Sequence, residues 1–318
     1  MKVIEHINQA QKTLFSFELL PPLKGHNIEG IYNTINPLME YNPSFVNITY
    51  HQEEVVYKKH KSGLLEKKTV RKRPGTVAIS AAIKYKYPSL DVVPHLICGG
   101  FTKEDTEYAL IDFHFLGINN VLALRGDPPK TMHVFLPEKD GHSHADDMVN
   151  QIMNMNKGIY LDEEMENSNS TDFCVGVAGY PEKHIESPNF ASDLKYLKMK
   201  IDAGAEYIMT QMFYDNQKYF DFVARCREYG INVPIIPGLK PITTLKDIKI
   251  LPKVFYIDIP EPLEKEIDKC KNNDDAFKVG IEWAIHQSKE LISFGVPVLH
   301  YFTIGISENI RQIAQTVF

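Results

Sequence analysis

Eight short apolar segments recur along the chain, and each ends on a polar residue or on a Gly/Pro turn. They span residues 13–22, 44–51, 92–100, 120–129, 173–184, 206–215, 233–241 and 296–305. Near-continuous apolar runs of this length are typical of parallel strands that are buried on both faces. Helical sequence follows most of them, so the pattern predicts an α/β fold, a closed (β/α)8 or TIM barrel.

Polar residues at the ends of these segments are the first candidates for a functional site. In a (β/α)8 barrel the carboxyl ends of all strands meet at one face, and that face carries the active site. The residues concerned are Glu18, Thr49, His95, Arg125, Asp127, Tyr180, His184, Gln211, His300 and Thr303. The sequence therefore predicts that they converge on one surface.

The segment 102–117 is a well-marked helix between two of the predicted strands. Thr102 with Asp105 three residues later forms the pattern of a capping box, which begins a helix. The i, i+3, i+7 spacing of apolar residues then predicts the buried face of this helix. The residues of that predicted face are Tyr108, Ile111 and Phe115.

Other connecting segments have the same character. Residues 217–230 and 274–295 are predicted helices that end on glycine, as short helix-to-strand loops require. No Gly/Ser-rich or Pro-rich linker divides the chain. We therefore expect residues 1–318 to form a single barrel domain.

Composition narrows the functional classes. The net charge of −6 argues against nucleic acid as a partner, and 43% hydrophobic with 24% charged residues is typical of a soluble globular protein. The four cysteines are scattered without a CxxC pair, and no apolar run is long enough to span a bilayer or resembles a signal peptide. We expect a cytoplasmic protein with small-molecule substrates, no membrane partner, and assembly with further copies of itself.

Two segments fall outside the repeat. Residues 51–76 are rich in Lys and Arg, but three glutamates interrupt the charge and no aromatic stacking pattern accompanies it. A solvated insertion at the barrel rim is therefore favoured over a nucleic-acid patch. Residues 127–147 form a long loop of the kind that usually has a function. Its His142 and His144 lack partners at metal-ligand spacing, so a loop without metal is favoured.

A nucleotide, if bound, is expected at the barrel mouth, because the chain has neither a GxGxxG nor a GxxxxGK[ST] motif. The predicted helix within residues 187–205 places Asp193, Tyr196 and Lys200 on one face. An acid, an aromatic ring and a base there suit a ribose, a stacked ring and a phosphate. An ordinary solvated face is the alternative, and the spacing alone favours it.

Glu18 is the strongest candidate for chemistry. A carboxyl group at a strand end, next to Pro21 and Pro22, is rigidly held, and partial burial raises its pKa toward the range that suits a general acid. A structural salt bridge explains the residue equally well. Gly126 permits a ligand to approach the backbone closely. Gln211 offers an amide to a heterocycle edge, although a lone glutamine is more often structural.

Taken in order, several motifs resemble one enzyme family along almost the whole chain. They are FSFELLPP, FVNITY, PHLICGGFTKE, ALRGDPP, GVAGYPEKH, DLKYLKMKIDAGAEYIMTQMFYD, VPIIPGLKP and LHYFTIG. The family they resemble is that of the methylenetetrahydrofolate reductases. The resemblance implies a (β/α)8 barrel that binds FAD non-covalently, a bacterial-type unit with the catalytic domain only, and a role in one-carbon metabolism and methionine synthesis.

The resemblance also implies residue roles. Glu18 matches the acid that protonates the folate nitrogen, and Asp127 matches the second catalytic residue, near the flavin pyrimidine edge. The implied substrate-binding residues are Gln211, Asp127, Thr49 and Asp247. The implied FAD-binding residues are Thr49, Tyr50, His95, Arg125, Gly126, Asp127, Ala145, Tyr180, His184, Asp193, Tyr196 and Lys200. Ala205 is implied to pack behind the helix that carries Asp193 and Lys200.

The implied reaction is a ping-pong reduction of 5,10-methylenetetrahydrofolate to 5-methyltetrahydrofolate, with NADH or NADPH as the reductant of FAD. Both substrates would use one flavin face. The chain departs from the family at Tyr196 and Met199, where bacterial members place Asn and Arg, and at Asp247 and Ile306, where they place Gln and Arg. These departures concern the diphosphate and the folate tail.

Two other interpretations stay open at this stage. A different flavin barrel enzyme, such as a proline dehydrogenase, needs an arginine cluster at the eighth strand, where residues 299–311 offer only Arg311. A non-catalytic folate-binding or flavin-binding subunit is expected to lack the acid, but Glu18 is present.

Overall fold

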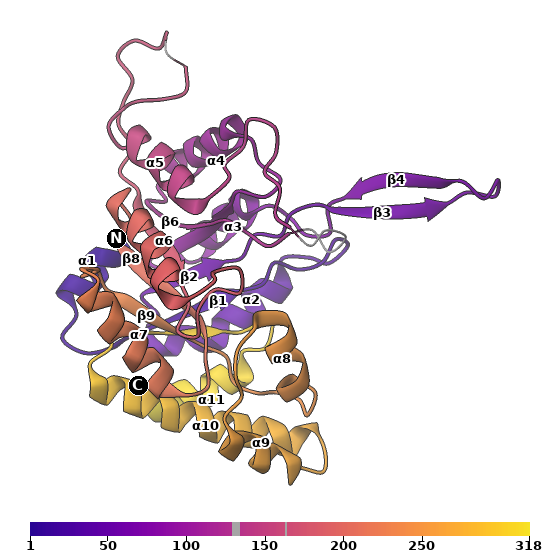
Figure 1. Cartoon of the computed structure of the whole chain (residues 1–318), viewed down its shortest axis with the longest axis vertical. Coiled ribbons are helices and arrows are strands. Elements are labelled where there is room, and N and C mark those ends of the chain that lie inside the picture. Colours follow the sequence, from indigo (N-terminus) through magenta and orange to yellow (C-terminus); the bar gives the residue numbers. More distant parts are fainter. Residues whose placement is uncertain (129–133, 163) are drawn as a thin grey trace.

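The eight apolar segments form a closed parallel barrel in the computed structural model of the chain, which describes residues 1–128, 134–162 and 164–318 (Figure 1). Around the barrel the strands follow the order β1, β10, β9, β8, β7, β6, β5, β2. Their bounds are β1 (Leu14–Leu19), β2 (Phe45–Ile48), β5 (Asp91–Ile97), β6 (Asn120–Leu124), β7 (Cys174–Gly179), β8 (Tyr207–Met212), β9 (Ile235–Leu239) and β10 (Val298–Phe302). The predicted (β/α)8 fold is confirmed.

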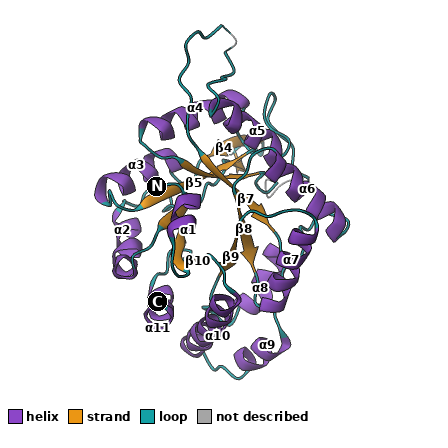
Figure 2. Cartoon of the chain, turned by 90° about the vertical axis from the view of Figure 1, so that its left-hand side faces the viewer, coloured by secondary structure: helices purple, strands orange, loops and turns teal. Residues whose placement is uncertain are grey.

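Helices surround the strands, except that α1 lies across one end of the barrel (Figure 2). They are α1 (Val3–Gln9), α2 (Glu29–Ile35), the 3-10 helix η1 (Asn36–Tyr41), α3 (Thr76–Lys86), α4 (Lys103–Phe115), α5 (Ala145–Met155), α6 (Phe190–Asp202), α7 (Asn216–Glu228), α8 (Asp247–Phe255), α9 (Glu261–Asp268), α10 (Asn273–Phe294) and α11 (Glu308–Val317). Part of the predicted loop 127–147, residues 129–133, lies outside the described residues.

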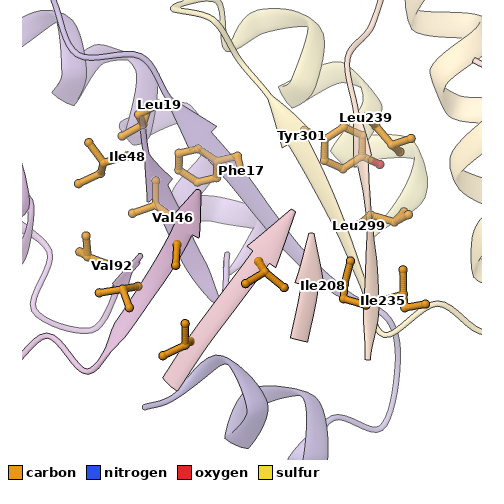
Figure 3. Packing of buried hydrophobic residues seen from close by; sticks show 14 of the residues in the cluster. Phe17, Leu19, Val46, Ile48, Val92, Ile208, Ile235, Leu239, Leu299 and Tyr301 are labelled. Atoms are coloured by element: carbon orange, nitrogen blue, oxygen red, sulfur yellow. The ribbon is translucent and has the colours of Figure 1, made fainter. Parts of the chain in front are cut away.

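Alternation along β1 explains how one strand serves both the core and the site. Phe15, Phe17 and Leu19 are buried in the layer between strands and helices. Figure 3 shows Phe17 and Leu19 beside Val46 and Ile48 of β2. Because successive side chains of a strand point to opposite faces, Ser16 and Glu18 point into the barrel. The chain thus holds its polar strand residues on the opposite side from a continuous apolar core.

Inside the barrel, an apolar layer closes the amino-terminal end of the strands. It contains Phe45, Val93 and Val298, and helix α1 packs beneath it through Val3. The backbone N–H of Val3 donates to Asn120 Oδ1 at the start of β6, at 2.7 Å. This plug directs access to the barrel interior toward the carboxyl ends of the strands.

Helix α4 begins as predicted but buries a different face. The Thr102 hydroxyl accepts from the Asp105 N–H at 3.0 Å, which confirms the capping box. The predicted burial of Tyr108 and Phe115 is wrong, since they are 62% and 85% exposed. Leu110 and Phe113 are buried instead. Because α4 carries aromatic residues on several faces, apolar spacing alone does not single out the buried one.

The basic segment 51–76 contains a β-hairpin that was not predicted from the sequence. Strands β3 (Glu54–Lys59) and β4 (Leu65–Val70) pair with each other and with no other strand among the described residues. The hairpin projects from the barrel on the side opposite helix α1 (Figure 1). Its position after β2 confirms an insertion at the rim of the barrel.

Candidate active site

A layer of polar side chains lies inside the barrel above the apolar plug. Ser16, Asn47, His95 and His300 come from β1, β2, β5 and β10, and all four are buried. The Ser16 hydroxyl contacts His300 Nδ1 at 2.9 Å, and Asn47 Nδ2 contacts His95 Nε2 at 3.1 Å. Each histidine is therefore oriented by a partner on a neighbouring part of the barrel wall.

Glu18 lies above this layer with its side chain 17% exposed. One carboxylate oxygen, Oε2, is 3.5 Å from His95 Nε2 and 4.0 Å from His300 Nε2. Burial raises the pKa of Glu18, and the opposing influence of His95 is smaller. The carboxyl group therefore holds its proton at a higher pH than an exposed glutamate does.

The two histidines beside Glu18 are neutral near pH 7. Burial lowers the pKa of His95 to about 4 and that of His300 to about 3. The contacts to Glu18 have the geometry of loose ion pairs, but without imidazolium charge they are not salt bridges at neutral pH. This argues against the structural salt bridge as the reason for Glu18.

His300 also has an unused polar atom that points toward Glu18. Its Nε2 is buried and has no hydrogen-bond partner among the described residues. Distances of 3.5 and 4.0 Å to the carboxylate are too long for good hydrogen bonds, which prefer 2.7–3.2 Å. A small movement, or a bound group between them, is needed to connect the acid with either histidine.

The loop after β6 places a guanidinium group at the barrel mouth. Arg125 makes a two-pronged ion pair with Glu186, with Nη2 to Oε1 at 2.7 Å, and its guanidinium also lies over the Phe135 ring. Gly126 has a φ of +84°, and a Cβ there would lie 3.2 Å from Ile97 Cβ. Asp127 is exposed, and its carbonyl accepts from Gln52 Nε2 at 3.0 Å.

The loop after β7 is held by helix α6. Asp193 accepts from the His184 N–H at 3.2 Å and from the Ser187 hydroxyl at 2.8 Å. The Tyr180 and His184 rings meet edge to face at 4.7 Å. Asp193 is thus part of the scaffold of this loop, and the solvated-face alternative is wrong for it.

Lys200, two turns beyond Asp193 along α6, reaches inward to the end of β7. Its Nζ donates to the Ala178 carbonyl at 2.6 Å, and burial lowers its pKa to about 8. Tyr196, predicted on the same face, is 52% exposed. The structure therefore brings Asp193 and Lys200 toward the strand ends and leaves Tyr196 largely in solvent.

Three further predicted residues lie at the carboxyl ends of strands. Thr49 donates its hydroxyl to the Leu19 carbonyl at 3.2 Å, one residue beyond Glu18. The Tyr50 ring packs edge to face on Phe101 at 5.0 Å. Gln211 is half-buried on β8, where its Oε1 accepts from the next backbone N–H at 2.9 Å.

Two predicted residues belong to helix starts near the mouth. Ala145 is the first residue of α5 and is buried. Asp247 opens α8, and its carboxylate accepts from the backbone N–H and hydroxyl groups of Thr243 and Thr244 at 2.7 to 3.2 Å. Lys240 Nζ lies 3.9 Å from Asp247. Asp247 therefore stabilises its own loop, and its predicted substrate contact stays a prediction.

Three contributors to this site were not predicted from the sequence. Asn47 carries no signal in sequence, because it is one polar residue within an apolar strand. Glu186 pairs with Arg125 from a loop 61 residues away, a distance that local patterns do not reach. The bond between Ser16 and His300 spans the two ends of the chain. The alternation of inward and outward side chains along β1 and β10 was the available signal that Ser16 and His300 both point into the barrel.

Within the ranges that the structure describes, no three His, Cys, Asp or Glu side chains gather as a metal site, and no helix is long and apolar enough to cross a membrane. His142 instead contacts Gln151 Oε1 with its Nε2 at 2.5 Å. His144 is the N-cap residue of α5.

Comparison with known proteins places these features in a family. The family profile "Methylenetetrahydrofolate reductase" matches residues 2–317. The chain is 32% identical to "Methylenetetrahydrofolate reductase (NADH) 1" of Arabidopsis thaliana over 97% of its own length and 49% of that protein. It is 30% identical to "5,10-methylenetetrahydrofolate reductase" of Salmonella typhimurium over 95% of its own length and 90% of that protein.

A solved structure shares the fold. It is described as an uncharacterized protein from Clostridium thermocellum that binds two copies of 5-methyl-5,6,7,8-tetrahydrofolic acid, with a TM-score of 0.54 and 16% identity over 99% of this chain and 98% of that one. The chain spans about half the length of the plant relative and nine-tenths of the bacterial one. By the profile match over residues 2–317 and the extent of the bacterial alignment, the chain belongs to the methylenetetrahydrofolate reductase family.

Proposed function

We propose that this chain reduces 5,10-methylenetetrahydrofolate to 5-methyltetrahydrofolate, with NADH or NADPH as the reductant and FAD as a bound cofactor. The observation that carries the proposal is Glu18, a carboxyl group with a raised pKa at the mouth of a barrel of this family. We place the reaction in the cytoplasm, which the four free cysteines support.

The residues at the mouth fit a flavin nucleotide. Lys200 offers an ammonium group whose hydrogen bond within the described residues is to one backbone carbonyl, so further N–H donors remain for a phosphate or ribose oxygen. Gly126 keeps the backbone after β6 free of a side chain that would contact Ile97. Arg125 lies in the loop after β6, and His184 lies in the loop after β7.

FAD, when bound, supplies the hydride transfer between NAD(P)H and the folate. Glu18 donates a proton to the folate nitrogen of the imidazolidine ring, which breaks the ring C–N bond and leaves an iminium carbon on the substrate. Burial suits Glu18 to this step, because its raised pKa keeps more of it protonated near neutral pH. His95 and His300 remain neutral beside Glu18, so no imidazolium charge stabilises its carboxylate form.

The other mouth residues position ligands. Asp127 is exposed in the loop after β6, and we propose that its carboxylate meets the pterin ring. Gln211 on β8 and Thr49 after β2 lie on other parts of the same rim. We propose that Gln211 contacts the folate and the nicotinamide in turn, since both substrates approach one face.

The first experiment is the absorbance spectrum of the purified protein. A flavin spectrum is expected, with bleaching by NADH or NADPH and recovery on addition of methylenetetrahydrofolate. A colourless protein that neither binds added FAD nor oxidises NAD(P)H contradicts the proposal. The same spectrum rejects a non-catalytic folate-binding subunit if the cycle is complete.

The second experiment replaces the acid. Glu18→Gln should slow the folate half-reaction on the order of a hundred- to ten-thousand-fold, the usual cost of losing general acid catalysis, while flavin reduction by NAD(P)H stays within a few-fold of wild type. Stopped-flow measurement separates the two half-reactions. Glu107→Gln is the matched control, since Glu107 is also buried with a raised pKa but lies on α4, facing Leu161. Equal slowing of both half-reactions by Glu18→Gln contradicts the assignment.

A proline dehydrogenase-like activity is not favoured. Arg311, the arginine that the sequence offered for such a substrate, lies on α11 and pairs with Glu308 on the same helix, with Nη2 to Oε1 at 2.9 Å. Oxidation of proline by the yellow protein would support that alternative.

A further inference from the structure

The β3–β4 hairpin, residues 54–70, is a projecting element with an unusual surface, and we call it the arm. A lone two-stranded hairpin is marginally stable in water, so a projecting one is best explained by a surface that it covers. Leu64 at its turn is 72% exposed, and Leu65 is 64% exposed. An apolar tip at the end of a charged ribbon is typical of an element that docks.

The register of the arm separates its side chains into two faces. Val55 opposes Thr69, Tyr57 opposes Lys67, and Lys59 opposes Leu65, so these six side chains share one face. We call Tyr57, Lys59, Leu65 and Lys67 its basic face. The opposite face carries Lys58 and Lys68 together with Glu54 and Glu66, so its charges balance. The basic face therefore combines apolar groups with uncompensated positive charge.

A complementary surface lies on helix α4. Glu104, Tyr108, Asp112 and Phe115 are exposed and follow each other at i, i+4, i+8 and i+11, so they form one stripe along the helix. We call this the acidic stripe. Its two aromatic side chains are 62% and 85% exposed. Within the described part of the chain, no ion pair engages the stripe's acids or the two lysines of the basic face.

Charge and length match between the two surfaces. Residues 51–76 contain eight Lys or Arg and three Glu, a charge of +5, which leaves −11 for the rest of a chain of net charge −6. Six-residue strands extend about 20 Å at 3.4 Å per residue, and a helix of 13 residues extends about 20 Å at 1.5 Å per residue. Two arms, both basic, would repel each other, which argues against pairing of arm with arm.

We propose that the arm of one chain docks along the acidic stripe of a second copy, and that the second copy returns the same contact. Exchange of this kind gives a twofold dimer, in which the same two surfaces are used by both chains. The arm extends away from the barrel on the side opposite α1, so it is placed to reach a facing molecule and not its own helix layer (Figure 1). The proposal does not depend on the reaction catalysed.

The test is charge reversal on each surface, with light scattering to measure the dimer. At low ionic strength the wild-type chain should be dimeric. Lys59→Glu with Lys67→Glu should weaken the dimer at least tenfold, because like charges across an interface repel strongly. Glu104→Lys with Asp112→Lys should do the same. Circular dichroism should show that both variants are folded, since all four positions are exposed.

Mixing the two variants is the decisive test. In the mixture each arm meets a stripe of opposite charge, so the dimer should return, although each variant alone is monomeric. Lys58→Glu with Lys68→Glu is the matched control, because it makes the same charge change on the opposite face of the same arm and should leave the dimer within about twofold. A monomeric wild type, a mixture that stays monomeric, or a control that dissociates like the first variant overturns the proposal. Binding of another acidic protein by a monomeric wild type also overturns it.

Discussion

The pair of buried histidines beside Glu18 ties stability to pH at the level of single residues. His95 and His300 have native-state pKa values of about 4 and 3, against 6.5 when unfolded. The native state therefore binds fewer protons than the unfolded state below pH 6.5. A depressed pKa contributes stability above the unfolded value, and that stability is lost as the pH falls toward the native value.

We accordingly predict that the free energy of unfolding falls by about 2 kcal/mol for each of these histidines between pH 7 and pH 5. His300→Asn should remove one such contribution and flatten the pH dependence by that amount. Urea unfolding at several pH values measures it, and His286→Asn, at an exposed position of α10, is the control. An unchanged slope for His300→Asn would show that His300 is not neutral in the native protein.

At this scale, the strand-end position of Glu18 could be predicted from the sequence, but its surroundings could not. Glu18 was identifiable because a carboxyl group at the end of an apolar strand is a local feature. Asn47, Glu186 and the Ser16 contact to His300 depend on neighbours that only the closed barrel brings together. Local patterns contain no information about such partners.

Helix α6 shows how an element supports the site from behind. Ala205 follows its end, is buried, and donates its N–H to the Lys200 carbonyl at 3.2 Å. Leu194 and Leu197 of α6 belong to the same buried cluster. A larger side chain at Ala205 is therefore expected to overpack the cluster that includes Leu194 and Leu197 of α6.

We predict that Ala205→Val costs about 1–3 kcal/mol of stability and weakens FAD binding without changing the folate half-reaction of the loaded protein. Added FAD should restore thermal stability by mass action. Ala191→Val, at an exposed position in the first turn of α6, is the control. The rate of flavin loss on dilution checks the coupling, and an unchanged rate would disprove it.

Elements were predicted well where their ends carry signals and poorly where charge obscures them. The capping residue Thr102 and the glycines after α7 and α10 marked real boundaries. The arm was missed because its lysines suggested a solvated loop. Two six-residue segments of strand-forming residues around a turn with Gly63 at φ +84° were the signal available for it.

At the scale of the whole molecule, β1 and β10 close the barrel. The Thr303 hydroxyl donates to the Glu18 carbonyl at 2.7 Å, and β1 pairs with β10 in parallel from Leu14 to Glu18. The eight-stranded order was predictable because parallel strands in a repeated unit close in only a few ways. The contacts between β1 and β10 therefore fix the position of Glu18.

We predict that Thr303→Val costs about 1 kcal/mol of stability and lowers kcat of the folate half-reaction more than it raises KM, because the bond holds the backbone of the acid. Thr316→Val is the control, since its hydroxyl also donates to a backbone carbonyl but on the exposed side of α11. Steady-state kinetics with thermal unfolding measures both effects. A change confined to KM would place Thr303 in substrate binding.

The closure of the barrel between β1 and β10 has a consequence for how the protein is made. The bond that fixes Glu18 joins residues 285 positions apart, so the first strand synthesised lacks its final neighbour until the ribosome has added the last. At roughly 5–20 residues per second this interval lasts tens of seconds. Throughout it the nascent chain exposes an unpaired edge of β1 to other chains. The contact between Glu18 and Thr303 therefore forms only after β10 has been translated.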